Sequence, residues 1–119
     1  MVIKMNNKYE KFYHYMGRMF GSRLVERQTN DRIYDDNNKD WYTIIDDDRI
    51  VAFISMTNDV IKNVYSVKDK YLEEILVTVG KETKIAPSIV TNLYQEVYEK
   101  AGFKVDDSCH YKNFIIISK

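Results

Sequence analysis

One stretch decides how the fold of this chain is read: NLYQEVYEKAGF, residues 92–103. Asn92 can cap the start of a helix, because its side-chain oxygen can accept a hydrogen bond from a free backbone N–H. Apolar residues then recur every four positions with two tyrosines beside them, which predicts one buried helix face made of Leu93, Val97, Ala101, Tyr94 and Tyr98. Gly102 can adopt the left-handed conformation that ends many helices, so Phe103 is expected to return to the core.

The rest of the chain predicts further strands and helices around this helix. Runs rich in β-branched and aromatic residues favour strands at residues 2–5, 41–45, 49–56, 60–65, 84–90, 103–105 and 111–117. Helical spacing of apolar residues favours helices at about residues 9–20, 23–31, 66–80 and 92–101. Strand–helix–strand steps in this order predict an α/β (α+β) fold, with a mixed, mostly antiparallel central sheet and helices on both faces.

Short polar segments mark where the chain is expected to turn. Asp46–Asp48 separates two strand-like runs, which predicts an antiparallel hairpin, and Asn58-Asp59 predicts the next turn. Ser66 is expected to cap the third helix, with a carboxylate three residues later as in a capping box. Pro87 lacks a backbone N–H, which places its strand at a sheet edge, a bulge or an interrupted ladder.

Length and composition indicate one domain, residues 1–119, and restrict its partners. The chain has 119 residues, 45% of them hydrophobic, which suffices for one core without disulfides or metal. The formal net charge is zero, so no global charge draws the chain to nucleic acid or membrane. The charge is uneven, with seven basic against three acidic residues in 1–34 and two against six in 35–49. Such a pattern fits a solvated helix followed by an acidic loop, or a basic helix face for an anionic partner.

Cysteine content and the lack of a targeting segment predict a cytoplasmic protein. The single cysteine, Cys109, cannot form an internal disulfide and fits a reducing compartment. No apolar stretch approaches membrane-spanning length, and Met1–Asn7 lacks the apolar core of a signal peptide. The wealth of Lys, Asn, Ile and Tyr follows A+T-rich codons, which suggests a low-GC bacterium or its phage. No spacing typical of a metal site occurs, and Cys109 and His110 are interpreted as structural.

The run at 92–103 resembles the last helix of the GNAT superfamily of acyl-CoA N-acyltransferases, which carries an Asn followed by a Leu/Val-Tyr-Glu-Lys-x-Gly-Phe run. The resemblance covers about residues 41–119 and is specific at 92–103. It implies acetyl-CoA in a notch between the strands at 60–65 and 84–90, and Tyr98 as the acid that protonates the departing thiolate. Tyr98 is equally well interpreted as an ordinary core tyrosine. Asn92 is implied to contact the pantetheine arm, although a plain helix cap is the alternative.

The resemblance also implies the remaining parts of an acyl-transfer site. Backbone N–H groups near Val64 and Tyr65 would stabilise the oxyanion and hold the cofactor. An ordered water or Asp59 would act as the base, and Asp59 is also a natural turn residue.

One segment departs from the family pattern. The glycine-rich loop that holds the diphosphate is replaced by SVKDKYLEE, residues 66–74, which has no glycine and several carboxylates. Lys68 and Lys70 would offset part of that negative charge, while Ser66 is expected to occupy the free donors at the helix start. The chain therefore resembles a degenerate member of the fold.

Two functions follow, and both stay open. The first is an N-acyltransferase that moves an acetyl group from acetyl-CoA to an amine of a small molecule or protein. The second is a catalytically inactive GNAT-fold binding or inhibitor protein, encoded by a phage or mobile element and acting on a host protein. Acyl-CoA-dependent modification of a nucleobase is a third alternative, against which the zero net charge counts. Pairing of the C-terminal strand between two copies would give a homodimer.

Overall fold

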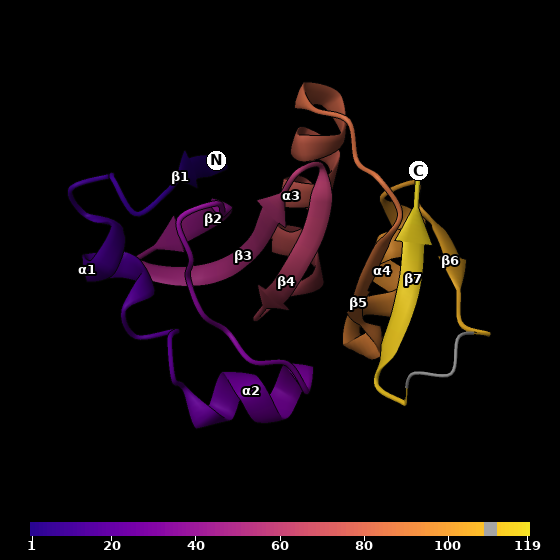
Figure 1. Ribbon diagram of the computed structural model, residues 1–119, viewed down its shortest axis with the longest axis horizontal. Helices are drawn as coiled ribbons and strands as arrows, with labels where there is room; N and C mark the ends of the chain where they lie inside the picture. The colour runs from indigo at the N-terminus through magenta and orange to yellow at the C-terminus, as the bar shows by residue number, and fades with distance from the viewer. Residues whose placement is uncertain (109–111) are drawn as a thin grey trace.

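Two antiparallel sheets and four α-helices make up the part of the chain that the structure describes (Figure 1), so the expected mixed α+β class is confirmed. The computed structural model describes residues 1–108 and 112–119, and the predicted structural roles of Cys109 and His110 lie outside the described residues. The strands are β1 Ile3–Met5, β2 Asp40–Asp46, β3 Arg49–Thr57, β4 Val60–Ser66, β5 Ser88–Thr91, β6 Lys104–Asp106 and β7 Phe114–Ser118. The helices are α1 Phe12–Met16, α2 Arg23–Thr29, α3 Asp69–Glu82 and α4 Gln95–Lys100, with the 3-10 helix η1 Asn92–Tyr94 directly before α4.

The first sheet consists of two consecutive hairpins with β1 added at one edge, in the order β1-β2-β3-β4. Between β2 and β3, Asp47 and Asp48 have φ angles of 51° and 60°. Between β3 and β4, Asn58 and Asp59 have φ angles of 50° and 67°. Two consecutive residues with positive φ are typical of the type I′ hairpin turn, whose twist matches that of the strands. Both expected turns are therefore confirmed.

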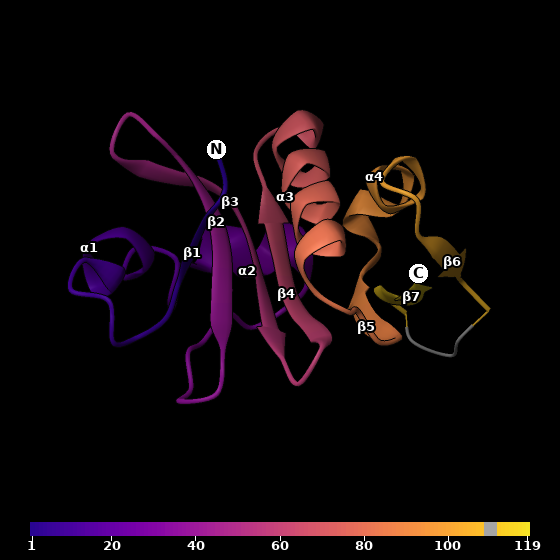
Figure 2. The ribbon, with the colours of Figure 1, turned by 90° about the horizontal axis from the view of Figure 1, so that it is seen from above.

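Helices cover both faces of this first sheet, as expected. Side chains alternate along a strand, so neighbouring residues pack on opposite faces. On one face, Tyr42 and Ile54 pack with the buried stripe of α3. On the other face, Trp41 and Phe53 pack with residues of α1 and α2. Figure 2 shows α3 and α2 on opposite sides of β2–β4, which gives the sheet two hydrophobic cores.

The second sheet has the order β5-β7-β6 and is separate from the first, which corrects the expectation of one mixed central sheet. Two hydrogen bonds join the chain near the starts of β4 and β5. Ahead of both strands, Ala86 N–H donates to Asp59 O (2.7 Å), and within them Ile61 N–H donates to Ser88 Oγ (2.9 Å). The second of these contacts uses a side chain in place of a backbone carbonyl. Pro87, directly before β5, has no N–H to donate. The two strands therefore run side by side without a backbone ladder between them.

Several predicted boundaries are wrong, each for a local reason. The strand expected at 84–90 begins only at Ser88, after Pro87. Asn92 does not cap a helix, because Thr91 Oγ1 accepts the Leu93 N–H (3.3 Å) at the start of η1. Leu93 was expected on the buried face of this helix, but it is 51% exposed. The stop was predicted correctly, since Gly102 has a φ angle of 93° and Phe103 is buried.

The helices also differ in detail from the expectation. The helix expected at about 9–20 is regular only in α1, although Phe12 and Met16 are buried as the spacing predicts. Ser66 does not cap α3, whose first flanking residue is Lys68 and which has no side-chain cap. The longest helix is α3, with 14 residues. Within the described residues, no helix combines the length and apolar character needed to cross a membrane.

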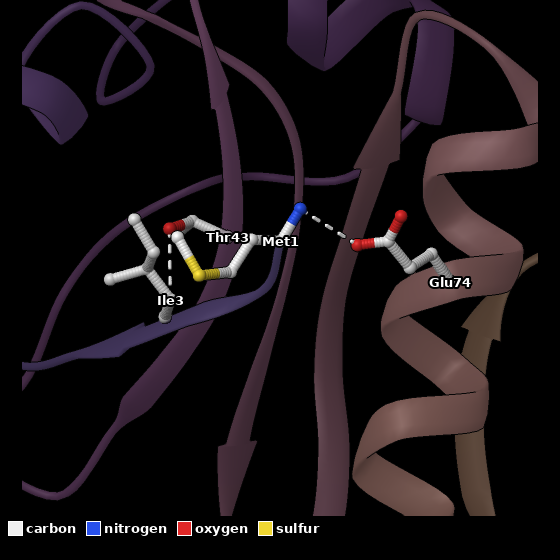
Figure 3. A network of polar contacts seen from close by, with 4 residues as sticks. All are labelled: Met1, Ile3, Thr43 and Glu74. Carbon is white, nitrogen blue, oxygen red and sulfur yellow. Dashed lines mark hydrogen bonds and ion pairs between the residues drawn. The ribbon is translucent and has the colours of Figure 1, made fainter.

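The N-terminal strand is held against the first sheet by polar contacts at both of its neighbours. Thr43 Oγ1 of β2 donates to Ile3 O (3.0 Å), and the Met1 ammonium lies 3.0 Å from a carboxylate oxygen of Glu74 on α3 (Figure 3). The ion pair is exposed, so it adds little stability. The backbone pairing of β1 with β2 and the Thr43 contact are what fix this edge strand.

Candidate functional site

The strongest candidate site lies where β4 and β5 part, at the carboxyl ends of both strands. A hollow of about 470 Å³ opens there and is called the notch below; its lining residues are Gln28, Tyr65, Ser66, Val67, Asp69, Leu93 and Tyr94. A second hollow of about 480 Å³ adjoins it along η1 and α4 and shares Asp69, Leu93 and Tyr94 with it. Both volumes fall within the range of small-molecule sites. The notch therefore collects residues from α2, β4, α3 and η1, which are far apart in the sequence.

Tyr94 lines the notch, and its hydroxyl bonds to the backbone at the end of β4. It accepts the backbone N–H of Ser66 (3.0 Å) and donates to the backbone carbonyl of the same residue (3.3 Å). Ser66 is the last residue of β4, an edge strand whose outer N–H groups need partners. The phenol thus satisfies both polar groups that would otherwise face the gap. The sequence pattern identified Tyr94 only as part of a buried helix face and did not predict this contact.

Tyr98, the predicted acid, lies behind Tyr94 and is fully buried. Its hydroxyl donates to the backbone carbonyl of Thr91 (3.0 Å). Burial raises the pKa of Tyr98 well above its ordinary value, and the neighbouring phenol of Tyr94 acts in the same direction. The Tyr98 phenol is therefore neutral over a wide pH range and engaged with the protein's own backbone. Its proposed role as an acid stays a prediction.

Asp59, the predicted base, lies at the opposite end of β4. It occupies the β3–β4 turn, and its backbone carbonyl accepts the Ala86 N–H. A seven-residue strand is about 20 Å long, so β4 separates Asp59 from the notch at Ser66. Asp59 lines a different and smaller hollow of about 240 Å³. The structure does not bring Asp59 and Tyr98 together.

The other predicted site residues fall into two groups. Tyr65 lines the notch, and Asn92 lines the adjoining hollow. Val64 is buried and lies two residues before Ser66 on β4. Because N–H groups two residues apart point to the same side of a strand, the Val64 N–H is directed towards the gap. Lys68 and Lys70 are exposed, and neither lines either hollow in the part of the chain that is described.

The start of α3 does not fit the diphosphate of acetyl-CoA. The Val67 N–H donates to Val51 O (2.9 Å), and the Lys68 N–H donates to Ser66 Oγ (3.3 Å), so neither is free for a phosphate. Asp69 places a carboxylate in the first turn of the helix, where an anion would have to lie. No glycine allows a closer approach of the backbone.

The electrostatics of the notch favour neutral or cationic ligands. Burial raises the pKa of both Tyr65 and Tyr94, and the hydrogen bond with Ser66 opposes this for Tyr94. Three carboxylates, those of Asp69, Glu96 and Glu99, line the two hollows. Among the described lining residues there is no Lys, Arg or His. The arrangement can donate and accept hydrogen bonds at neutral phenols and attract positive charge.

The described residues contain no group of three His, Cys, Asp or Glu placed to hold a metal ion. Comparison of the chain with known protein families, with curated proteins and with solved structures found no match.

Proposed function

We propose that this chain is a binding protein built on a GNAT-like arrangement of strands, whose notch holds a ligand other than acetyl-CoA. The element order from β2 to β7 and the parting of β4 and β5 support the likeness. The observation that carries the proposal is the double hydrogen bond between the Tyr94 hydroxyl and the backbone of Ser66. A ligand that enters the notch deeply would have to break it.

The surface around the notch supports a protein segment as the ligand. Val67 and Leu93 are each about half exposed at its rim (53% and 51%). On α2, the exposed Leu24 lies one turn before Gln28, which lines the notch. Carboxylates extend from this apolar rim along α4. A partner that offers apolar side chains beside Lys or Arg would complement both features.

An N-acetyltransferase is the second candidate. It is favoured by the direction of the Val64 N–H, which faces the gap as an oxyanion donor would, and by Tyr98 on α4, whose hydroxyl reaches Thr91 O at the end of β5. It is disfavoured because the N–H groups of Val67 and Lys68 already donate within the protein and cannot bind a phosphate.

Calorimetric titration with acetyl-CoA and with free CoA separates the two candidates. The binding-protein proposal predicts neither heat nor thermal stabilisation at about 1 mM ligand, a concentration that reveals affinities as weak as −4 kcal/mol. Micromolar binding of acetyl-CoA would overturn it. If that binding weakened in the Lys68→Gln/Lys70→Gln variant, the acetyltransferase would take its place.

A capture experiment tests the partner surface directly. The intact chain and two variants, Glu96→Lys and Leu93→Ser, are used as bait in the same extract. Both altered side chains are exposed, so the fold should persist. Glu82→Lys, at the far end of α3, is the matched charge control. We expect a partner that the intact chain and the control retain and the two variants lose. Equal retention by all four proteins would exclude this surface.

A further inference from the structure

A separate hollow of about 360 Å³ lies beside β3, β4 and the α2–β2 connection and shares no lining residue with the notch. It is called the Lys39 hollow here. Two lysines, Lys39 and Lys62, and two aspartates, Asp31 and Asp36, line it. Its volume is at the lower end of small-molecule sites. Charges of both signs therefore face one small space.

These four charges do not neutralise one another directly. The ion pairs of the described residues are Met1 with Glu74, Lys4 with Asp40, and His14 with Asp48, each within 4.0 Å. None of them includes a charge of the Lys39 hollow. Opposite charges that share one hollow usually approach each other, because each gains from the other's field. Here the fold holds them apart.

Lys39 is fixed by the protein around it and is 5% exposed. Its Nζ donates to Tyr34 O (2.9 Å) and to Asn63 Oδ1 (2.9 Å), and it lies 3.8 Å from the centre of the Tyr34 ring. An ammonium has three N–H donors, so one is left over after these two bonds. Burial lowers the pKa of Lys39, as expected for a cation removed from water.

Two neutral groups complete the site. Thr57 lines the hollow, and its hydroxyl is buried without a hydrogen-bond partner among the described residues. Such a group costs stability unless something bonds to it. The amide of Asn63 joins the two halves, because its oxygen accepts from Lys39 while its Nδ2 donates to Asp31 Oδ2 (3.0 Å).

We propose that the Lys39 hollow binds a small zwitterion of the α-amino acid type. The ligand carboxylate faces the ammonium groups of Lys39 and Lys62 and accepts from the Thr57 hydroxyl. The ligand ammonium faces Asp31 and Asp36. A ligand with a single charge is attracted by two of these four side chains and repelled by the other two, so it binds less tightly than a zwitterion. The site does not depend on the function proposed for the notch.

The single tryptophan offers a direct test, since the Trp41 ring lies 5.5 Å from Lys39 Nζ. The intact chain is titrated with glycine, L-alanine and L-serine while Trp41 emission and the thermal midpoint are followed. Acetate and ethylammonium serve as probes that carry one charge only, at matched ionic strength. We expect saturable responses to at least one amino acid, at least about tenfold stronger than for either single-charge probe. No saturation by any of the three amino acids up to about 50 mM would overturn the proposal.

Two variants test the residues without relying on the buried lysine, whose loss could unfold the chain. Thr57→Val removes the unpartnered hydroxyl but keeps the side-chain shape, and Lys62→Gln removes one exposed charge. Each should weaken amino acid binding about fivefold or more, while Lys70→Gln, an exposed lysine on α3, should not. The proposal would be refuted if all the variants bound the amino acid equally, or if the intact chain bound acetate and alanine equally, since either result would show a nonspecific response.

Discussion

Replacing Tyr94 by Phe tests the central contact of the notch with the smallest possible change. The variant keeps the ring, which is buried, and removes only the hydroxyl that bonds to Ser66 N–H and O. Ser66 is itself buried, so its N–H would be left without an acceptor. Leaving a buried donor unpaired costs about 1–3 kcal/mol. For a domain of this size each kcal/mol lowers the thermal midpoint by roughly 3–5 °C.

Tyr98→Phe is the matched control for this prediction. It also removes a buried phenol hydroxyl, but that hydroxyl only donates, to Thr91 O. A carbonyl that loses one donor is less costly than an orphaned N–H, so we expect about 0.5–1.5 kcal/mol. Tyr94→Phe should therefore be the more destabilising of the two, even though Tyr98 is the more deeply buried residue.

Urea unfolding followed by Trp41 fluorescence measures both variants, and hydrogen exchange locates the effect. The Ser66 amide should exchange faster in Tyr94→Phe than in the parent chain, and unchanged in Tyr98→Phe. If Tyr94→Phe cost less than about 0.5 kcal/mol, or if the Ser66 amide kept its protection, the Tyr94 hydroxyl would not be the group that stabilises the Ser66 backbone.

Three further predictions concern pH and backbone strain. Burial raises the pKa of Tyr98, so the stability that its neutral phenol contributes is complete below pH 10 and is lost as the pH rises further. The free energy of unfolding should therefore fall more steeply at alkaline pH in the parent chain than in Tyr98→Phe. Circular dichroism measures this difference. Burial likewise raises the pKa of Asp31 above its ordinary value, so the ionisation of this carboxyl opposes folding as the pH rises. Asp31→Asn should therefore be more stable than the parent chain in urea at pH 7. The difference should vanish towards pH 3. Asp59→Gly relieves a positive φ of 67° and should raise stability by roughly 0.5–1 kcal/mol; a loss of stability in thermal unfolding would show that the Asp59 side chain has a role beyond the turn.

The sequence predicted those parts of the fold that local chemistry decides. A few neighbouring residues determine each of these parts, and each was predicted correctly: the strand segments, the Asp-rich turn at 46–48 and the helix end at Gly102. The separation into two sheets depends on contacts across the chain, such as the Ile61 N–H taken by Ser88 Oγ. Periodicity predicts which residues are strands but not whether neighbouring strands share backbone hydrogen bonds.

The candidate site was less accessible to sequence reasoning for the same reason. Tyr94 and Tyr98 lie four residues apart and read as one buried face, yet their hydroxyls reach different backbone groups. A buried tyrosine must find a partner for its hydroxyl, and this was the one signal that could have drawn attention to Tyr94. Which partner it finds, Ser66 on a strand 28 residues earlier, follows only from the packing of η1 against β4.

The hydrogen-bond partners of the free edge of β4 affect which ligands the notch can bind. Two of its outer N–H groups are satisfied by side chains rather than by a neighbouring strand: Ser88 accepts the Ile61 N–H near the start of β4, and Tyr94 accepts the Ser66 N–H at its end. A backbone ladder opens only cooperatively, whereas a single phenol can be displaced by one ligand acceptor of equal strength. Exchanging one hydrogen bond for another is nearly neutral in free energy, while breaking it without replacement costs about 1–3 kcal/mol. A ligand that brings its own acceptor to Ser66 N–H therefore avoids a penalty of roughly 5- to 150-fold in affinity, and this selects for carbonyl-bearing ligands such as peptides.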